Sequence, residues 1–214
     1  KMFDVDKTIY CLEGRSWRKD YYKQYKLNRT ENRAKQTVSE QEEDRAFWQA
    51  YDELTTFVKD KSNATVVRHE NAEADDLIAR WIQTHPQDQH IILSSDSDFK
   101  QLLAENVTIY NGVAAEVWNL DGVFDDKMKP VIDKKTKEPK KIEDPEWILF
   151  EKCIRGDATD NVFSAYPGVR KTKLEEAFKD NDIIEEQDAC ADILYVAYGS
   201  NPDILYLAIR LCES

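Results

Sequence analysis

Hydrophobic positions in the first 120 residues change period several times, and each period predicts a different element. Apolar residues recur every three or four positions in 39–60 and again in 71–83, as on an amphipathic helix. Shorter runs rich in β-branched residues predict strands at 63–68, 89–95, 106–111 and 115–120. Strands that alternate with helices predict an α/β fold with a mostly parallel central sheet flanked by helices.

The strand expected at 89–95 carries three consecutive aliphatic residues. Continuous apolar runs of this kind are typical of parallel strands that are buried on both faces. Farther on, residues 144–156 begin with Asp144-Pro145 and end at Gly156, which are start and stop signals of a helix. The lysine-rich and turn-rich segment 121–145 predicts an exposed hairpin or loop.

These elements predict two parts. We expect an α/β core over residues 1–156, which includes a basic segment at 15–38, and a helical region over 157–214. We find no apolar run of membrane-spanning length and no signal-peptide pattern, and therefore expect no membrane partner. The scattered cysteines favour a reducing cytoplasm over a disulfide framework; they are Cys11, Cys153, Cys190 and Cys212.

Charge is unevenly distributed along the chain. The net charge is −12, which by itself argues against a nucleic-acid partner. Residues 15–35, however, hold eight Lys or Arg and two acids, a local charge of +6, and residues 127–141 hold seven Lys and two acids, a local charge of +5. The chain is therefore bipolar, and basic surfaces for phosphate groups remain compatible with its acidic composition.

Short carboxylate motifs follow or open the expected strands and helices. They are "FDVD" with Asp4 and Asp6, "EADD" at 73–76, "SSDSD" at 94–98 and "GDATD" at 156–160. Each motif alone is more often a turn or a helix cap than a ligand. Ligands of open α/β sheets bind beyond the carboxyl ends of the strands, so we expect these motifs to converge on one crevice. Asp157 and Asp160 would face one way if their segment were helical.

Such a cluster needs cations. Two unit charges ~4 Å apart repel by about 4 kcal/mol at an effective dielectric of 20. Mg²⁺ prefers carboxylate and water oxygens, and the three histidines form no zinc pattern. Two such ions roughly 4 Å apart would hold the attacking water and the leaving oxygen in phosphodiester hydrolysis. We therefore expect two Mg²⁺ ions, with Mn²⁺ as a substitute.

An ordered set of motifs carries a family resemblance. "SWRKD", "YKLNR", "EADD", "SSDSDF" and "GDATDN", in that order, resemble the 5′-nuclease superfamily, and most closely the ribonuclease H of T-even-type bacteriophages. The resemblance implies a PIN-like fold and, at 166–178, a helix–three-turn–helix. It also implies 5′→3′ exonuclease and flap endonuclease activity on DNA or RNA:DNA, for primer or flap removal in phage replication.

The resemblance also implies the roles of individual residues. The metal ligands would be Asp4, Glu13, Glu73, Asp75, Asp76, Asp96, Asp98, Asp157 and Asp160. The catalytic residues would be Lys26, Arg29, Asp75 and Asp96. Nucleic acid would be bound by Arg15, Arg18, Lys19, Tyr25, Lys26, Arg29, Arg33, Lys171 and Lys173. Aromatic residues between these basic ones, Tyr25 among them, would stack on unpaired bases or pack in the core.

The amino end departs from the family pattern. Only thirteen positions separate Asp4 from Trp17, too few for the parallel crossover that the family has there. Either segments are absent from this chain, or residues 2–14 form one strand. Asp4 and Glu13 are consequently in question as a pair, although either one fits.

Two other functions fit parts of the sequence. "FDVDKT" resembles the signature of haloacid-dehalogenase-type phosphatases, with Asp4 as nucleophile, Asp6 as acid/base and Ser94 as the serine of the family's second motif. A catalytically inactive nucleic-acid-binding module is the other alternative. For the nuclease we expect a monomer in the host cytoplasm, with a single-strand-binding protein or a clamp as further partners.

Overall fold

The computed structural model describes residues 3–180. The chain forms two compact units. Among the described residues, the first unit holds 3–80 together with 159–161, and the second holds 81–158 and 162–180. This division differs from the boundary at 156 expected from the sequence, and the predicted helical region extends beyond the described residues. Within residues 3–180, no helix combines the length and the apolarity that a membrane crossing requires.

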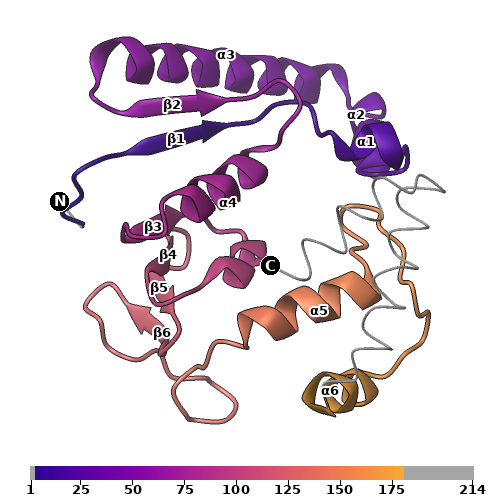
Figure 1. Cartoon of the computed structure of the whole chain (residues 1–214). Helices are drawn as coiled ribbons and strands as arrows, with labels where there is room; N and C mark the ends of the chain where they lie inside the picture. The colour runs from indigo at the N-terminus through magenta and orange to yellow at the C-terminus, as the bar shows by residue number, and fades with distance from the viewer. Residues whose placement is uncertain (1–2, 181–214) are drawn as a thin grey trace. The chain divides into compact units, whose positions relative to one another are not determined.

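The first unit is built on two parallel strands. Its elements are β1 (Ile9–Leu12), α1 (Arg18–Tyr21), α2 (Leu27–Ala34), α3 (Val38–Lys61), β2 (Thr65–Arg68) and the start of α4 (Ala74–Thr84). β1 pairs with β2 in register from Ile9 opposite Thr65 to Leu12 opposite Arg68. Figure 1 shows α3 running alongside this pair. The three helices between the strands form the crossover that parallel pairing requires.

β1 corrects one expectation about the amino end. The strand covers only Ile9–Leu12 of the stretch expected as one strand, and it begins five positions after Asp4, so Asp4 lies ahead of the strand and not at its carboxyl end. Glu13 directly follows the strand at its carboxyl end. Of the two alternatives, the structure therefore places Glu13, and not Asp4, where ligands of an α/β sheet bind.

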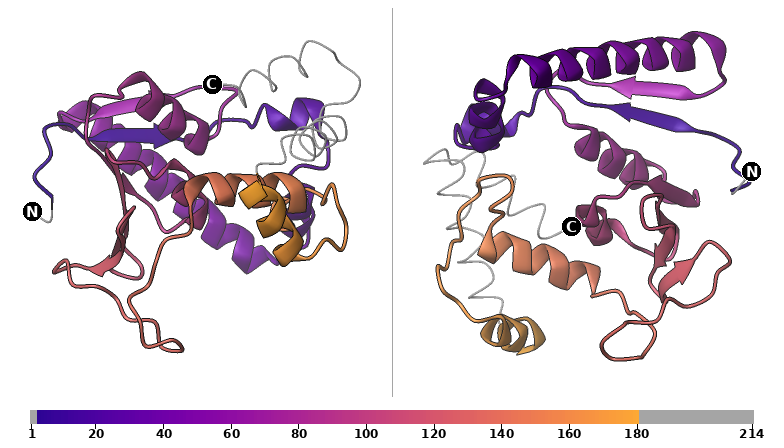
Figure 2. Two further views of the ribbon diagram at one scale, coloured as in Figure 1. Left: turned by 60° about the horizontal axis from the view of Figure 1, so that its bottom comes forward. Right: turned by 180° about the vertical axis from the view of Figure 1, so that it is seen from behind.

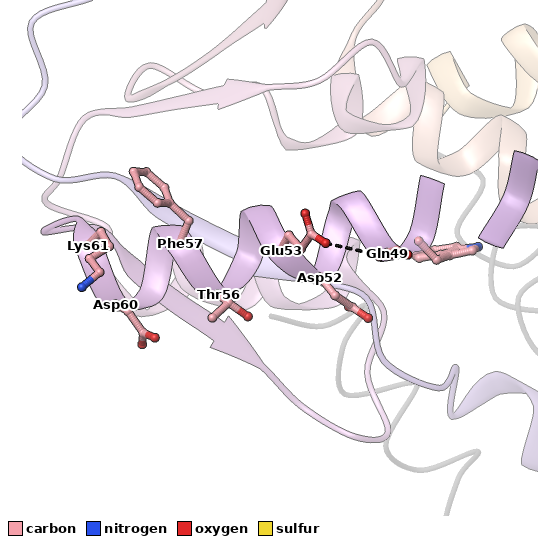
Figure 3. Close-up of a pocket in the computed structure, with 8 residues that line it drawn as sticks. Gln49, Asp52, Glu53, Thr56, Phe57, Asp60 and Lys61 are labelled. Carbon is pink, nitrogen blue, oxygen red and sulfur yellow. Dashed lines mark hydrogen bonds between the residues drawn. The ribbon is translucent and has the colours of Figure 1, made fainter. Parts of the chain in front are cut away.

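The helix expected at 39–60 is present as α3. Thr37 caps it, and Glu40 completes a capping box by returning its side chain to the Thr37 backbone. Within its apolar stripe Val58 is buried, but Phe47 and Phe57 are exposed. An open hollow of about 680 Å³ runs along α3 (Figure 3), lined by Trp48, Gln49, Asp52, Glu53, Thr56, Phe57, Asp60 and Lys61. None of these residues belongs to the predicted site.

The second unit contains a four-stranded sheet and two longer helices. Its elements are β3 (His90–Leu93), η1 (Ser97–Leu102), β4 (Val107–Asn111), β5 (Glu116–Asn119), β6 (Gly122–Asp125), α5 (Pro145–Arg155) and α6 (Lys171–Asp180). The strand order is β3-β4-β5-β6. β3 and β4 run parallel, whereas β4–β5 and β5–β6 are antiparallel. The α/β class is confirmed, with mixed strand pairing.

The core of this unit lies on the inner strands. Ile109 and Val107 of β4 are almost completely buried. On β3, Ile92 is buried while Ile91 and Leu93 are exposed, so the expectation that this strand is buried on both faces is wrong. Ile91 and Leu93 are two positions apart and therefore lie on the same face of the strand, which is exposed while the face of Ile92 packs in the core. A second cluster joins the helices, through Trp147, Phe150, Ile154 and Leu174.

The helix predicted at 144–156 is confirmed as α5. The Asp144 carboxylate accepts a hydrogen bond from the Glu146 backbone, and Pro145 occupies the first turn. At the other end Gly156 has a φ of 69°, and a Cβ there would lie 2.5 Å from the carbonyl oxygens of Val162 and Phe163. Glycine therefore permits the sharp turn into the "GDATDN" segment.

Candidate active site

The first two acids of the site stabilise the start of α4. The Asp76 carboxylate accepts from the Glu73 backbone N–H at 3.0 Å, and the Glu13 carboxylate accepts from the Ala74 N–H at 2.8 Å. These bonds satisfy backbone donors that a helix N-terminus leaves unpaired, where negative charge is favourable. Asp75 lies exposed in the same first turn. Four of the predicted metal ligands thus meet at one helix terminus.

A close backbone approach brings the basic segment to this terminus. The Gly14 N–H donates to the Ala72 carbonyl at 3.0 Å, and the Arg15 N–H donates to the Glu70 carbonyl at 2.8 Å. A Cβ on Gly14 would lie 2.6 Å from the Ala72 oxygen and closer still to that of His69. Only glycine fits there, and this close contact places the residues that follow Gly14 beside the N-terminus of α4.

Glu73 is the centre of what we call the Glu73 cluster. Its side chain is buried, with the residue 4% exposed. Lys26 Nζ lies 2.5 Å from one carboxylate oxygen; Ser16 Oγ, Arg18 Nη1 and Tyr25 Oη lie 2.7, 3.0 and 3.1 Å from the other. Burial alone would raise the pKa of Glu73, but the hydrogen bonds from Lys26 and Ser16 outweigh it, and the net shift is downward. Glu73 is therefore held as a buried anion.

Arg18 joins two of the acids. Both terminal nitrogens of its guanidinium donate hydrogen bonds to the Asp76 carboxylate, at 2.8 and 3.1 Å, and Nη1 also donates to Glu73. Burial would lower the pKa of Arg18, but the hydrogen bond and the charge of Asp76 raise it. The structure thus places Arg18 on the predicted metal ligands. The neighbouring Arg15 instead pairs with Asp20 at the exposed surface.

Asp160 is brought into the same cluster from far along the chain. The Lys26 backbone N–H donates to the Asp160 carbonyl at 2.8 Å, and Arg29 Nη2 lies 2.6 Å from Asp160 Oδ1. Asn28 donates to the Thr159 carbonyl at 3.1 Å, and Asn161 donates back to the Gln24 carbonyl at 2.8 Å. These bonds explain why 159–161 belongs to the first unit.

Tyr25 packs in the core, which is the second of the two places expected for the aromatic residues of this segment. Its hydroxyl lies 3.1 Å from both the Glu73 and the Asp160 carboxylates, and the residue is 8% exposed. Burial, followed by the charges of these two acids, raises the pKa of the phenol. A neutral Tyr25 has one proton, which it can donate to either of these two carboxylates. Its ring is packed inside the unit, whereas stacking on a base needs an exposed ring.

The remaining basic residues of the set are at the surface. Lys19 and Arg33 are exposed on α1 and α2. Lys173 is exposed in the first turn of α6. Lys171, at the start of the same helix, contacts Glu143 at 3.0 Å and has its Nζ 5.7 Å from the Trp147 ring centre. The structure leaves all four accessible, and their contact with phosphate stays a prediction.

The second unit holds its own acid–base group, which we call the Lys152 bridge. Lys152 Nζ lies 2.6 Å from Asp98 Oδ2 and 3.0 Å from Asp157 Oδ2. Burial would lower the pKa of Lys152, but the two carboxylates raise it. Asp96 caps η1, because its carboxylate accepts from the Asp98 N–H at 2.8 Å. Asp98 and Asp157 thus both contact the ammonium group of Lys152.

The "GDATDN" segment is a turn, not a helix. Asp157 and Val162 exchange both backbone hydrogen bonds, at 2.8 and 2.9 Å, and Asn161 has a φ of 60°. The expectation that Asp157 and Asp160 face one way on a helix is therefore wrong. Asp157 contacts Lys152 of the second unit, whereas Asp160 contacts Lys26 and Arg29 of the first.

The donor set fits a hard divalent cation, because the clustered acids offer only carboxylate oxygens. Among residues 3–180, however, no three His, Cys, Asp or Glu side chains gather closely enough to hold a metal. Basic side chains neutralise the acids instead, which corrects the premise that only divalent ions could make the gathering tolerable. The neutralising residues are Arg18, Lys26, Arg29 and Lys152.

The sequence did not predict a site role for two residues of these clusters. Ser16 is buried and donates to Glu73, but serine in a basic surface motif gives no signal of burial. Lys152 lies one turn before Gly156 on α5, and only its position five residues ahead of Asp157 hints at a pair. Neither residue carries a motif, so tertiary contacts were needed to find them.

An α/β fold whose carboxylates are clustered with lysine and arginine fits a hydrolase of the nuclease class, because phosphodiester cleavage uses carboxylates for metal ions and basic groups for phosphate. The family model for the 5′-3′ exonuclease, N-terminal resolvase-like domain, matches residues 2–134. The chain belongs to this family. The haloacid-dehalogenase alternative is set aside, because residues 3–8 precede β1 instead of ending a strand.

Solved structures agree with the fold. A bacteriophage T5 protein co-crystallised with metal ions is 20% identical, with a TM-score of 0.67, over 98% of this chain and 86% of that one. The bacteriophage T5 flap endonuclease, in a pseudo-enzyme-product complex with DNA and metal ions, is 19% identical, with a TM-score of 0.65, over 98% and 85%. The T5 5′-exonuclease with bound zinc is 20% identical, with a TM-score of 0.60, over 98% and 84%. No curated protein sequence matches this chain.

Proposed function

We propose that this 5′-3′ nuclease is a divalent-metal-dependent 5′→3′ exonuclease and flap endonuclease that cuts DNA or RNA:DNA near a 5′ end. The observation that carries the proposal is the Glu73 cluster, in which the "YKLNR" and "EADD" motifs meet through Lys26 and Glu73 at 2.5 Å. The structural neighbours are described with DNA and with metal ions, which supports the same substrate class and cofactor class.

Mg²⁺ is the proposed cofactor, as two ions, with Mn²⁺ as a substitute. Asp98 and Asp157 would hold one ion with Asp96, and Glu73, Asp75, Asp76, Glu13 and Asp160 would serve the other. Bound ions would supply a water nucleophile active at neutral pH and stabilise the leaving oxygen. Lys26 and Ser16 keep Glu73 anionic, and Arg18 and Tyr25 help to orient its carboxylate, a condition for its use as a ligand.

Lys26 and Arg29 are proposed to stabilise the charge of the scissile phosphate. In the structure both basic groups contact Asp160. Phosphate and carboxylate therefore compete for the same donors, and substrate binding would require these ion pairs to rearrange. A neutral Tyr25 between Glu73 and Asp160 would keep those acids in place when Lys26 moves.

Removal of primers or flaps in phage replication is the proposed biological role, in the cytoplasm of a host cell. The enzyme would act as a monomer, and a single-strand-binding protein or a clamp is the partner that such a role favours.

A cleavage assay on a 5′-flap duplex tests the proposal. We expect release of the flap with Mg²⁺ and none with EDTA. Asp98→Asn and Asp160→Asn keep side-chain shape but remove charge, and each should lower activity by about 10- to 100-fold or more. Asp60→Asn, the same change at an exposed position on α3, is the matched control. Normal cutting by both site variants would contradict the assignment, and binding without cutting would favour the inactive module.

A further inference from the structure

The lysine-rich segment that begins with β6 has no part in either carboxylate cluster, yet hydrogen bonds hold its backbone in a defined fold. Residues 122–140 fold back and forth in three short stretches. The Asp125 N–H donates to the Lys129 carbonyl and the Asp133 N–H to the Glu138 carbonyl, both at 2.8 Å. The Lys140 N–H closes the third stretch on the Val131 carbonyl, also at 2.8 Å. We call this segment the lysine hairpin; its two turns follow β6 in Figures 1 and 2.

An aspartate organises each turn. The Asp125 carboxylate accepts from the backbone N–H groups of Lys127 and Lys129, at 2.9 and 2.8 Å. The Asp133 carboxylate accepts from those of Lys135 and Thr136, at 2.7 and 2.9 Å. These backbone hydrogen bonds lower the pKa of both aspartates, which keeps them ionised and bound to the turn. The Asp125 and Asp133 carboxylates are therefore engaged by the backbone of their turns, whereas Asp126 and Glu138 are exposed.

The lysines of the turns are exposed instead. They are Lys127 and Lys129 in the first turn, and Lys134, Lys135 and Lys137 in the second. The Lys140 side chain is the exception, because it turns inward to Glu116 at 2.8 Å. Left-handed backbone at Met128 and Lys137, with φ of 57° and 63°, tightens each turn. The hairpin thus presents five exposed lysines on a backbone held by hydrogen bonds.

We propose that the lysine hairpin is an additional contact surface for the sugar–phosphate backbone of the nucleic-acid substrate. The inference rests on the proposed function and extends it to a part of the chain outside the clusters. Residues 127–141 carry a local charge of +5, and the charge stays positive, at +3, when Asp125 and Asp126 of the first turn are included, in a chain whose net charge is −12. At physiological salt the screening length is about 8 Å, so acids farther away do not cancel this charge for a phosphate in contact.

A polyanion is the partner whose chemistry fits. Duplex DNA carries one negative charge per roughly 1.7 Å of its axis, so neighbouring lysines of one turn can engage successive phosphates. Lysine supplies a point charge without the planar fork of arginine. The hairpin would therefore strengthen binding irrespective of base sequence.

Salt-dependent binding tests the proposal. We would measure the affinity for a fluorescent DNA duplex in EDTA between 50 and 200 mM salt, for wild type and for the Lys134→Ser/Lys135→Ser double variant. Each phosphate contact contributes about 0.9 to the slope of log K against log salt, so the slope should fall by about 2. The Lys134→Arg/Lys135→Arg variant retains the charge and should retain the slope.

The matched control removes two exposed lysines at the end of α3. Lys59→Ser/Lys61→Ser makes the same change in net charge and should leave the slope near that of wild type. An equal fall in both serine variants would show a general charge effect and overturn the inference, as would an unchanged slope in the hairpin variant. If wild type neither bound nor cut nucleic acid, the proposed function itself would fail. If wild type bound and cut nucleic acid but the hairpin variant kept the wild-type salt slope, the hairpin proposal alone would fail.

Discussion

At the scale of single residues, a charged side chain is defined by its partners more than by its position in a motif. Arg15 and Arg18 stand three positions apart in one basic segment. Arg15 pairs with Asp20 where both side chains are about half exposed, whereas Arg18 holds Asp76 with two nitrogens and touches Glu73. Surface pairs contribute ~0–1 kcal/mol, while a forked arginine also sets the geometry of its acids.

Exchange of arginine for lysine separates the two roles. Arg18→Lys keeps the charge but loses the planar guanidinium that contacts Asp76 with two nitrogens. We therefore expect roughly tenfold lower kcat with little change in the salt slope of DNA binding. Arg15→Lys should stay within about 0.5 kcal/mol of wild type in unfolding free energy and cut normally. Steady-state cleavage and duplex binding measure these effects. Normal cutting by Arg18→Lys with a changed salt slope would instead make Arg18 a phosphate contact.

At the scale of elements, two connections between secondary-structure elements determine where the functional side chains lie. Gly14 passes against the backbone of the β2–α4 connection, and Gly156 turns the chain out of α5. At each of these two positions a Cβ would meet backbone oxygens, which cannot move aside as a flexible side chain can. The glycines are therefore structural conditions for the Glu73 cluster and the Lys152 bridge.

Alanine at Gly14 tests the first connection. Gly14→Ala should lower the free energy of unfolding by about 1–3 kcal/mol, because its Cβ overlaps carbonyl oxygens. Gly112→Ala is the matched control, since its Cβ would meet only a Tyr110 ring carbon at an ordinary 3.6 Å. Urea unfolding of both variants gives the comparison. Equal stability of the two variants would mean that the backbone of the β2–α4 connection shifts to accommodate the added Cβ.

The sheet of the second unit offers a pH test. Glu116 of β5 accepts from Lys140 at 2.8 Å and from Trp118 at 3.0 Å. Burial would raise the pKa of Glu116, but these hydrogen bonds outweigh it and the net shift is downward. A lowered pKa in the folded state stabilises the fold above the unfolded-state value of about 4.3, and this contribution disappears as pH falls through the folded-state value.

Glu116→Gln should therefore cost at most about 1 kcal/mol at pH 7, since the pair is partly exposed. The difference from wild type should shrink below about pH 4, where the wild-type carboxyl is protonated as well. Thermal or urea unfolding across pH 3–7 provides the measurement. A difference that stays constant with pH would show that packing, not charge, is responsible.

At the scale of the whole molecule, the excess of acids makes stability responsive to divalent ions. The chain has 42 acids against 30 basic residues, and its predicted ligands are all carboxylates. A ligand that binds only the folded state stabilises it by about 2.7 kcal/mol at a hundred times its Kd. Mg²⁺ should therefore raise the melting temperature by several degrees more than NaCl of equal ionic strength.

The Asp98→Asn/Asp157→Asn double variant should lose much of this specific rise, because it removes two of the proposed ligands. Differential scanning calorimetry in Mg²⁺, in NaCl and in EDTA distinguishes the effects. Asp60→Asn again serves as the control, and it should respond to Mg²⁺ as wild type does. A rise of equal size in NaCl would indicate general screening and contradict specific binding.

Local sequence was sufficient for most elements and for the identity of the acids. α3, α5 and the strands at β2, β3, β4 and β5 follow from period, capping residues and stop signals, because these depend on neighbours within a few positions. The ordered acidic motifs likewise predicted the family that the chain belongs to. The start of β1 and the turn at "GDATDN" were missed, since there backbone pairing prevailed over local pattern.

Tertiary structure alone decided the partners of the acids. Lys26 meets Glu73 across 47 positions and Arg29 meets Asp160 across 131, and no local pattern encodes a contact at such separations. The same holds for burial, because Tyr25 and Ser16 look like surface residues until the chain folds over them. The sequence determines which charges the protein carries, whereas long-range packing determines which of them neutralise one another, because ion pairing depends on distance in space.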